Sequence, residues 1–173
     1  MPINHIETER LRLRPWKKED AQALYKYASN ENVANPAGWP RHTSVEMSEE
    51  VIATYFAEPE TYAIVLKSSG EPVGCIGLVP RDSEHRKSLD DDEREIGYWI
   101  GEPLWGQGLI PEAINALEKH WQSKMHISKL WIITYDFNLK SQRVAEKCGF
   151  SFIDKFISTE GAASKAFCKN LDR

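Results

Sequence analysis

Apolar residues follow two different periods along this chain, and the order of these periods predicts a mixed set of strands and helices. Leu11 and Leu13 alternate with arginines within residues 8–16, which is the period of a half-buried strand. Apolar residues at helical spacing then predict helices at 18–29 and 44–56. Between these helices, the segment Asn35-Pro36-Ala37-Gly38-Trp39-Pro40 predicts a turn-rich loop.

The middle of the chain carries the pattern of sheet strands. Residues 62–67 and 73–79 are short apolar runs joined by Ser-Gly-Glu-Pro, and they predict a hairpin. Residues 95–100 predict a further strand. The charged segment 81–94 before it is typical of a solvated loop.

The pattern changes again after this strand. Residues 111–125 place apolar side chains at steps of three and four behind an initial proline, which predicts an amphipathic helix. The apolar run 130–135 predicts a strand, 139–147 a short helix and 150–153 another strand. A strand, a helix and a strand in succession indicate a parallel pair joined by a right-handed crossover.

Composition adds bounds to this picture. The chain has 173 residues, 41% of them hydrophobic, with no repeat or linker, so we expect one domain over residues 1–173. No stretch approaches the roughly 20 apolar residues that span a bilayer, so no membrane association is predicted. The sequence pI near 5.8 and the net charge of −4 supply no overall positive field for phosphate backbones, and no nucleic-acid partner is expected.

Cysteine and histidine usage bears on location and on metals. Cys75, Cys148 and Cys168 are widely spaced and odd in number, which favours a reducing compartment over a disulfide framework. The start of the chain has no basic region leading into an apolar one, so a cytoplasmic protein is expected. Neither the cysteines nor the histidines have metal-ligand spacing, so no metal site is predicted.

A glycine loop lies between the strand ending at Ile100 and the helix beginning at Pro111. Gly106 and Gly108 let the backbone turn tightly, and the helix start adds the positive end of its dipole, which together suit an anionic phosphate. The alternative is a tight turn that happens to use glycine. The loop lacks the Gly-Lys-Ser/Thr ending of a triphosphate loop and the third glycine of a dinucleotide fingerprint, so neither a kinase nor a dehydrogenase is favoured.

Four segments nevertheless occur together in order, and they carry a family resemblance. They are Thr8-Glu9-Arg10-Leu11-Arg12-Leu13-Arg14-Pro15-Trp16, Glu95-Ile96-Gly97-Tyr98-Trp99-Ile100, Trp105-Gly106-Gln107-Gly108-Leu109-Ile110-Pro111-Glu112-Ala113 and Asn138-Leu139-Lys140-Ser141-Gln142-Arg143-Val144-Ala145-Glu146-Lys147-Cys148-Gly149-Phe150. The combination resembles the GNAT superfamily of acyl-CoA-dependent N-acyltransferases, in particular the branch of ribosomal-protein N-terminal (alanine/serine) acetyltransferases. The resemblance covers about Thr8 to Phe152.

The resemblance implies an α+β fold of the GNAT type. Such a fold has a central, twisted, mixed sheet with helices on both faces. The sheet is splayed between its fourth and fifth strands, here the strands ending at Ile100 and Tyr135, and acetyl-CoA lies in the gap as co-substrate. No metal is implied.

The resemblance also assigns residues to the cofactor. It implies that the main chain near Trp99 and Ile100 pairs with the pantetheine and polarises the thioester carbonyl, while Asn138 and Ser141 lie along the pantetheine. Backbone N–H groups would hold the pyrophosphate in a loop made of Trp105, Gly106, Gln107, Gly108, Leu109 and Ile110. Trp105 and Ile110 depart from the general superfamily pattern, which we interpret as a trait of the branch. From the residues alone, Asn138 is equally a helix cap, and the two roles are compatible.

Two catalytic candidates follow. The tyrosine that many superfamily members use as acid is replaced here by Ala145, so Ser141 is the candidate for protonating the thiolate. Alternatively the thiolate leaves without an acid, since thiol pKa values lie near about 8.5. Glu95 is the leading base for the amine, on one strand face with Trp99. Its alternative interpretation is a surface carboxylate, and Glu93, Asp92 and His85 are weaker candidates for the base.

The expected reaction is direct transfer of an acetyl group from acetyl-CoA to a primary amine in a ternary complex. The acceptor is either a protein N-terminal α-amine or a small amine, and the protein is a monomer or a homodimer. Trp39 lies where the family forms its acceptor pocket, and it either covers the substrate or fills the core. A different class of function, a catalytically weak CoA-binding sensor or interaction module, is suggested by Ala145.

Overall fold

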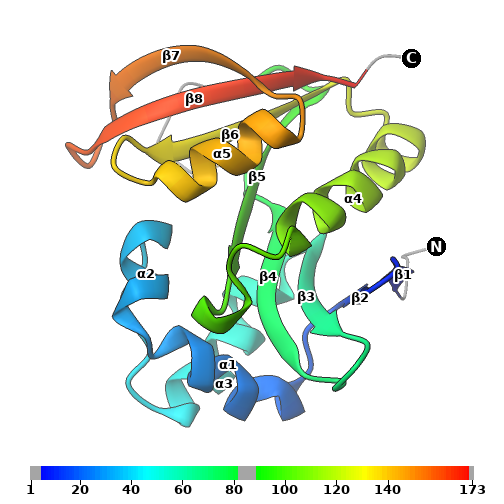
Figure 1. The fold of residues 1–173 in the computed structure, drawn as a ribbon, viewed down its shortest axis with the longest axis vertical. Helices are drawn as coiled ribbons and strands as arrows, with labels where there is room; N and C mark the ends of the chain where they lie inside the picture. The colour runs from blue at the N-terminus through cyan, green and yellow to red at the C-terminus, as the bar shows by residue number, and fades with distance from the viewer. Residues whose placement is uncertain (1–4, 82–88, 172–173) are drawn as a thin grey trace. The chain divides into compact units, whose positions relative to one another are not determined.

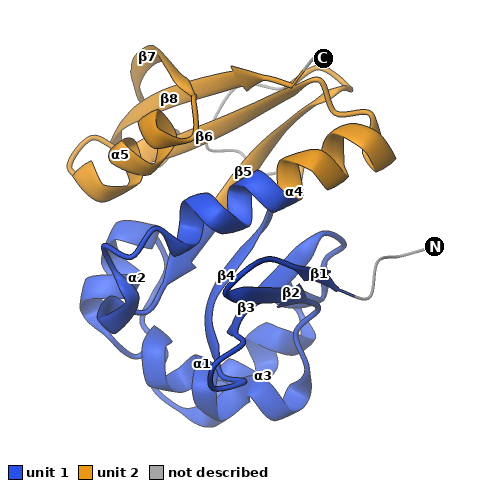
Figure 2. Ribbon diagram, turned by 45° about the vertical axis from the view of Figure 1, so that its right-hand side comes forward, with its two compact units in different colours: residues 1–77, 98–116 blue, residues 78–97, 117–173 orange. Residues whose placement is uncertain are grey.

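The structure is a computed structural model that describes residues 5–81 and 89–171. These residues divide into two compact units, which Figure 2 distinguishes by colour. Unit 1 comprises residues 1–77 and 98–116, and unit 2 comprises residues 78–97 and 117–173. Of the helices in the described ranges, none combines the length and the apolar character needed to cross a lipid bilayer.

Unit 1 begins with an antiparallel run of strands (Figure 1). Its strands are β1 (Ile6–Glu7), β2 (Leu11–Arg14), β3 (Thr61–Leu66) and β4 (Pro72–Leu78), the last residue of which falls in unit 2. Its helices are α1 (Ala21–Ala28), α2 (Glu31–Ala37) and α3 (Val45–Ala53), with short 3-10 turns at Lys18–Asp20, Tyr55–Ala57 and Glu102–Leu104. The predicted hairpin and the helices at 18–29 and 44–56 are confirmed within a few residues.

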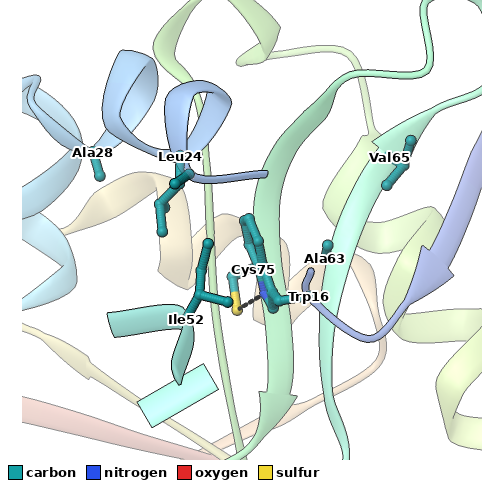
Figure 3. Packing of buried hydrophobic residues seen from close by; sticks show 8 residues of the cluster. Trp16, Leu24, Ala28, Ile52, Ala63, Val65 and Cys75 are labelled. Carbon is teal, nitrogen blue, oxygen red and sulfur yellow. Dashed lines mark hydrogen bonds between the residues drawn. The ribbon is translucent and has the colours of Figure 1, made fainter. Parts of the chain in front are cut away.

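Leu11 and Leu13 of β2 are completely buried in the core of unit 1, which explains why apolar residues alternate with arginines in this strand. Figure 3 shows a second buried cluster, in which the indole Nε1 of Trp16 donates to Cys75 Sγ at 3.4 Å. Burial raises the pKa of Cys75 to about 12, with the Trp16 hydrogen bond opposing it. This thiol is therefore a packing group and not a nucleophile.

The loop predicted over residues 35–40 is wrong for its first half, because α2 continues through Pro36 to Ala37. Both ends of this helix are capped. The Asn30 side chain accepts from the N–H of Asn32, and Gly38 ends the helix at a φ of 87°. Pro36 lacks the N–H that would bond to the carbonyl oxygen of Asn32, and the caps at both ends offset this lost hydrogen bond.

Unit 2 is a strand and helix arrangement that ends in a hairpin. It contains β6 (Lys129–Tyr135), α5 (Leu139–Lys147), β7 (Ser151–Ile157) and β8 (Ala163–Asn170). The helix has the predicted bounds. β8 was not predicted, and it pairs antiparallel with both β6 and β7 and so lies between them. β7 extends beyond the predicted end at residue 153 because this pairing continues to Ile157.

Two elements contain residues of both units, namely β5 (Glu93–Ile100) and α4 (Leu109–Met125). β5 pairs parallel with β6 over Glu93–Ile96 and Lys129–Ile132, so a parallel pair does occur, with α4 as its connecting helix. The strands on either side of α5 do not pair as predicted, because β8 lies between β6 and β7. The hydrogen-bonded strand order is β1-β2-β3-β4-β5-β6-β8-β7, a mixed sheet as expected. Glu93 and Arg94 belong to β5, so the predicted loop over 81–94 is too long at its end, while residues 82–88 lie outside the described ranges.

Candidate active site

The glycine loop in unit 1 has the backbone conformation that its sequence predicts. Gly106 and Gly108 have φ values of 78° and 75°, in the left-handed region. A Cβ added at Gly106 would meet nothing within 4 Å, and one at Gly108 would meet only Arg10 Nη2 at 3.8 Å. Glycine is therefore required here by the backbone conformation and not by close packing. Residues 106–108 are exposed, whereas Leu109 and Ile110 are buried and anchor the loop.

The hydrogen bonds of this loop use its carbonyl groups. The carbonyl oxygen of Gln107 accepts from Arg10 Nη1 at 3.0 Å, and that of Gly108 accepts from the N–H of Glu112 at 3.2 Å. In the described ranges, the N–H groups of Gly106, Gln107 and Gly108 have no protein acceptor. Exposed donors in front of the first turn of α4 fit a diphosphate, which needs several convergent N–H groups.

Trp105 lies at the start of this loop. Its indole Nε1 donates to the carbonyl oxygen of Ile100 at 2.9 Å. The side chain thereby joins the end of β5 to the loop. A direct contact between Trp105 and the cofactor stays a prediction.

The end of β5 lies close to β4 within unit 1. A Cβ added at Gly74 would collide with the carbonyl oxygen of Trp99, so only glycine permits this approach. The N–H of Gly101 donates to the carbonyl oxygen of Val73 at 2.8 Å. These contacts fix the main chain of Trp99 and Ile100, for which the family resemblance implies pairing with the pantetheine.

Trp39 lies against Trp99 in the same unit. The two indole rings are 5.5 Å apart between centroids in an edge-on arrangement, and Trp39 is also 5.5 Å from the ring of His42. His42 is buried, which lowers its pKa, and its Nδ1 lies 2.8 Å from Ser48 Oγ. Trp39 is half-buried and packs on the core, so it combines a packing role with a partly accessible ring.

The other predicted cofactor residues lie in unit 2, at the start of α5. The Asn138 side-chain oxygen accepts from the N–H of Ser141 at 3.2 Å, which confirms the predicted cap. The Gln142 amide donates to the carbonyl oxygens of Tyr135 at 3.2 Å and Asp136 at 2.9 Å, and it accepts from Lys165 at 3.1 Å. These bonds fix the start of α5 to the end of β6.

Glu95 is buried in unit 2, with 7% of its surface exposed. It lies opposite Trp131 of β6 in the strand register, and its main-chain oxygen accepts from the N–H of Val79 at 2.8 Å. Two of the weaker base candidates accept hydrogen bonds from nearby side chains. Glu93 accepts from Trp131 Nε1 at 2.7 Å, and Asp92 accepts from the Ser128 hydroxyl. His85 lies outside the described residues.

The acidic residues near the start of β5 form a small group. Carboxylate oxygens of Asp90, Asp92 and Glu93 lie within 4.8 Å of one another. Such groups are common at exposed positions without a metal ion, and nothing further in the described residues indicates one.

The site residues thus fall into two sets, each held by its own unit. The loop from Trp105 to Gly108 belongs to unit 1 together with Trp39, Trp99 and Ile100, whereas Glu95, Asn138 and Ser141 belong to unit 2. Leu109 and Ile110, which the sequence placed in the loop, are instead the first residues of α4, because the helix begins two residues before Pro111. One contact escaped the sequence prediction. Arg10 binds both the loop and Glu112. Both residues lie in segments that carry the family resemblance, Arg10 in Thr8-Glu9-Arg10 and Glu112 directly after Pro111.

Comparison with known proteins gives the same family as the sequence. A family model described as an acetyltransferase (GNAT) domain matches residues 10–151. The uncharacterized N-acetyltransferase YoaA of Bacillus subtilis (strain 168) is 28% identical over 150 residues, which cover 84% of this chain and 81% of that protein. The ribosomal-protein-serine acetyltransferase of Escherichia coli (strain K12) is 38% identical over 56 residues, covering 32% of this chain and 31% of that protein.

A solved structure supports the fold. The microcin C7 self-immunity acetyltransferase MccE, in complex with acetyl-CoA and AMP, aligns with a TM-score of 0.76. The alignment covers 94% of this chain and 93% of that chain at 20% sequence identity.

Proposed function

Since this chain belongs to the GNAT acetyltransferase family, which acts with acetyl-CoA, we propose that it acetylates a primary amine by direct transfer in a ternary complex. The observation that carries the proposal is the exposed loop of Gly106 and Gly108, whose N–H groups precede α4. We propose as acceptor the α-amino group at a protein N-terminus. A small amine is the alternative.

The residues of this chain fit the cofactor that the family uses. The loop N–H groups would hold the pyrophosphate, and the main chain of Trp99 and Ile100 would pair with the pantetheine, with Asn138 as a further partner. When bound, acetyl-CoA supplies the activated acetyl group as a thioester. A main-chain N–H aimed at the thioester oxygen stabilises the charge that develops there.

Two side chains would move protons. An amine near neutral pH is mostly an ammonium ion, so the nitrogen must lose a proton before it bonds to the acetyl carbon. Glu95 would accept that proton, directly or through water. As the carbon–sulfur bond breaks, the Ser141 hydroxyl would give a proton to the thiolate and regain one from the nitrogen, which loses its second proton on becoming the amide. Ala145 carries no acidic proton, so the usual tyrosine acid has no equivalent there.

One observation supports a protein N-terminus as acceptor. The relative from Escherichia coli is named for serine acetylation of a ribosomal protein, and its match to this chain covers 56 residues. Trp39, whose half-buried ring lies beside Trp99, would contact either kind of amine. We place the activity in the cytoplasm, where the three free cysteines stay reduced.

The test is an acceptor screen that follows free-thiol release from acetyl-CoA and the mass of the product. The panel contains peptides beginning with Ser or Ala, the same peptides with a blocked N-terminus and an internal Lys, polyamines and amino sugars. We expect thiol release with the unblocked peptides alone. Release with small amines only would overturn the protein acceptor. CoA binding without release for any acceptor would favour the sensor or interaction module that Ala145 suggests.

A further inference from the structure

An arginine near the start of the chain contacts both the glycine loop and the first turn of α4, which follows it. Arg10, in the turn between β1 and β2, donates from Nη1 to the carbonyl oxygen of Gln107 at 3.0 Å. Its Nε and Nη2 both lie 2.8 Å from Glu112 Oε1, and its main-chain N–H donates to Glu112 Oε2 at 2.9 Å. Gln107 precedes Gly108, and Glu112 lies in the first turn of α4. The Arg10 side chain therefore bridges the glycine loop and the start of α4.

The carboxylate of Glu112 is fully engaged by this turn. The Thr8 hydroxyl donates to the same oxygen as the Arg10 main chain. The Glu112 side chain is 18% exposed, against 45% for Arg10. Burial by itself raises the pKa of Glu112, but the hydrogen bonds from Thr8 and Arg10 outweigh it and leave the pKa below its ordinary value. The carboxylate is thus ionised and balanced by one guanidinium.

The bond to Gln107 also determines where the next N–H points. No cis peptide bond occurs among the described residues, and in a trans peptide the C=O and the following N–H point in opposite directions. Because the Gln107 carbonyl points toward Arg10, the N–H of Gly108 points away from it. Loss of the arginine would free this peptide to rotate, since glycine at Gly108 tolerates many conformations.

The pairing of Arg10 with Glu112 also changes the net charge at the start of α4. A carboxylate in the first turn of a helix interacts favourably with the helix dipole, but it repels a second anion at the same helix end. Glu112 occupies the first turn of α4, directly after the loop that would take a diphosphate. With Arg10 paired to it, the two side chains carry no net charge. Without Arg10, Glu112 would compete with the phosphates.

We propose that Arg10 is a positioning residue for cofactor binding, which orients the Gly108 N–H through Gln107 and neutralises Glu112 at the start of α4. The proposal rests on the proposed function, since it takes the loop as the site of the CoA pyrophosphate. Arg10 itself need not touch the phosphates.

The test measures CoA affinity by calorimetry for Arg10→Ala, Glu112→Gln and the double variant. Arg12→Ala is the matched control, because it removes the same charge from the neighbouring strand, where Arg12 pairs only weakly with Glu7 at 3.4 Å. We expect Arg10→Ala to weaken CoA binding roughly tenfold or more and Arg12→Ala to change it less than about twofold. The double variant should bind CoA more tightly than Arg10→Ala, because it no longer carries an unpaired carboxylate.

Three further readouts separate this role from a general loss of structure. In the CoA-free protein, amide hydrogen exchange over residues 106–110 should be faster in Arg10→Ala than in Arg12→Ala, at comparable unfolding temperatures. The KM for acetyl-CoA should rise while kcat and the KM of the acceptor stay near wild type. Arg10→Lys should restore little affinity, because one ammonium group cannot reproduce the forked contacts.

The outcomes distinguish the two proposals. CoA affinity in Arg10→Ala equal to that of Arg12→Ala would overturn the role of Arg10. A double variant that binds no better than Arg10→Ala would overturn the neutralisation of Glu112. If the wild-type protein bound no CoA at all, the proposed function would fail instead, while hydrogen exchange would still report whether Arg10 holds the loop.

Discussion

The indole Nε1 of Trp105 donates a hydrogen bond to the carbonyl oxygen of Ile100 at 2.9 Å. The bond closes the short turn at Glu102–Leu104, so the end of β5 and the start of the glycine loop are held together. The sequence assigns both residues to the cofactor. The structure gives Trp105 the additional task of fixing the distance between the strand that would hold the pantetheine and the loop that would hold the pyrophosphate.

Trp105→Phe removes this donor and keeps most of the ring. We expect a loss of about 1 kcal/mol in the free energy of unfolding and a several-fold rise in the KM for acetyl-CoA. Trp16→Phe is the control, because it removes an indole donor to Cys75 in the core, away from the loop. It should lower stability without changing that KM. An unchanged KM in Trp105→Phe would mean that the bond serves stability alone.

Glu95→Gln preserves the shape of the side chain and removes its basicity. We expect kcat to fall by roughly 100-fold or more, with loss of the acidic limb of the pH–rate profile and little change in CoA affinity. Glu93→Gln is the matched control, since its amide oxygen still accepts from Trp131 Nε1. A pH–rate profile that is the same in Glu95→Gln and wild type would remove Glu95 from the role of base.

Gly106→Ala tests the conformation of the loop against a control of nearly identical strain. Gly70 has a φ of 74°, close to the 78° of Gly106, and an added Cβ meets nothing within 4 Å at either position. Both alanine variants should lower the free energy of unfolding by about 1 kcal/mol. Only Gly106→Ala should weaken CoA binding. Equal CoA affinities in the two variants would contradict the phosphate loop.

Trp39→Ala tests whether the ring beside Trp99 contacts the acceptor. We expect the KM for the acceptor to rise about fivefold, while the KM for acetyl-CoA stays close to wild type, since an aromatic contact is worth about 1 kcal/mol. Trp39→Phe should retain most of the affinity. Tyr55→Ala, which removes an aromatic ring that is 74% exposed, should leave both constants unchanged. If neither KM rose, Trp39 would have a packing role in the core and no contact with the acceptor.

The lowered pKa of Glu112 predicts a pH dependence of stability. A carboxyl group whose pKa is lower in the folded than in the unfolded protein stabilises the fold above the unfolded value, and this stabilisation is lost as the pH falls through the folded value. The unfolded value is near 4.5. In urea unfolding, the advantage of wild type over Glu112→Gln should therefore be full at pH 7 and shrink below pH 4.5. A difference that stays constant with pH would contradict the prediction.

Local rules of the sequence determined much of this protein. The alternation at Leu11 and Leu13 predicted a buried strand face, and the spacing at 139–147 predicted α5 with its bounds. Asn138 was predicted as a cap. Gly106 and Gly108 adopt the positive φ that their loop suggested. These features depend on neighbours within a few residues, which a sequence pattern contains.

Tertiary structure decided the rest, because the partners are distant along the chain. α2 passes through Pro36, where caps at both ends outweigh a local breaker. β8 lies between β6 and β7, a placement that no local period encodes. Arg10 meets Glu112 across 102 positions of sequence. The charges of both residues are visible in the sequence, but only the fold brings them within 3 Å and turns two surface residues into the support of one loop.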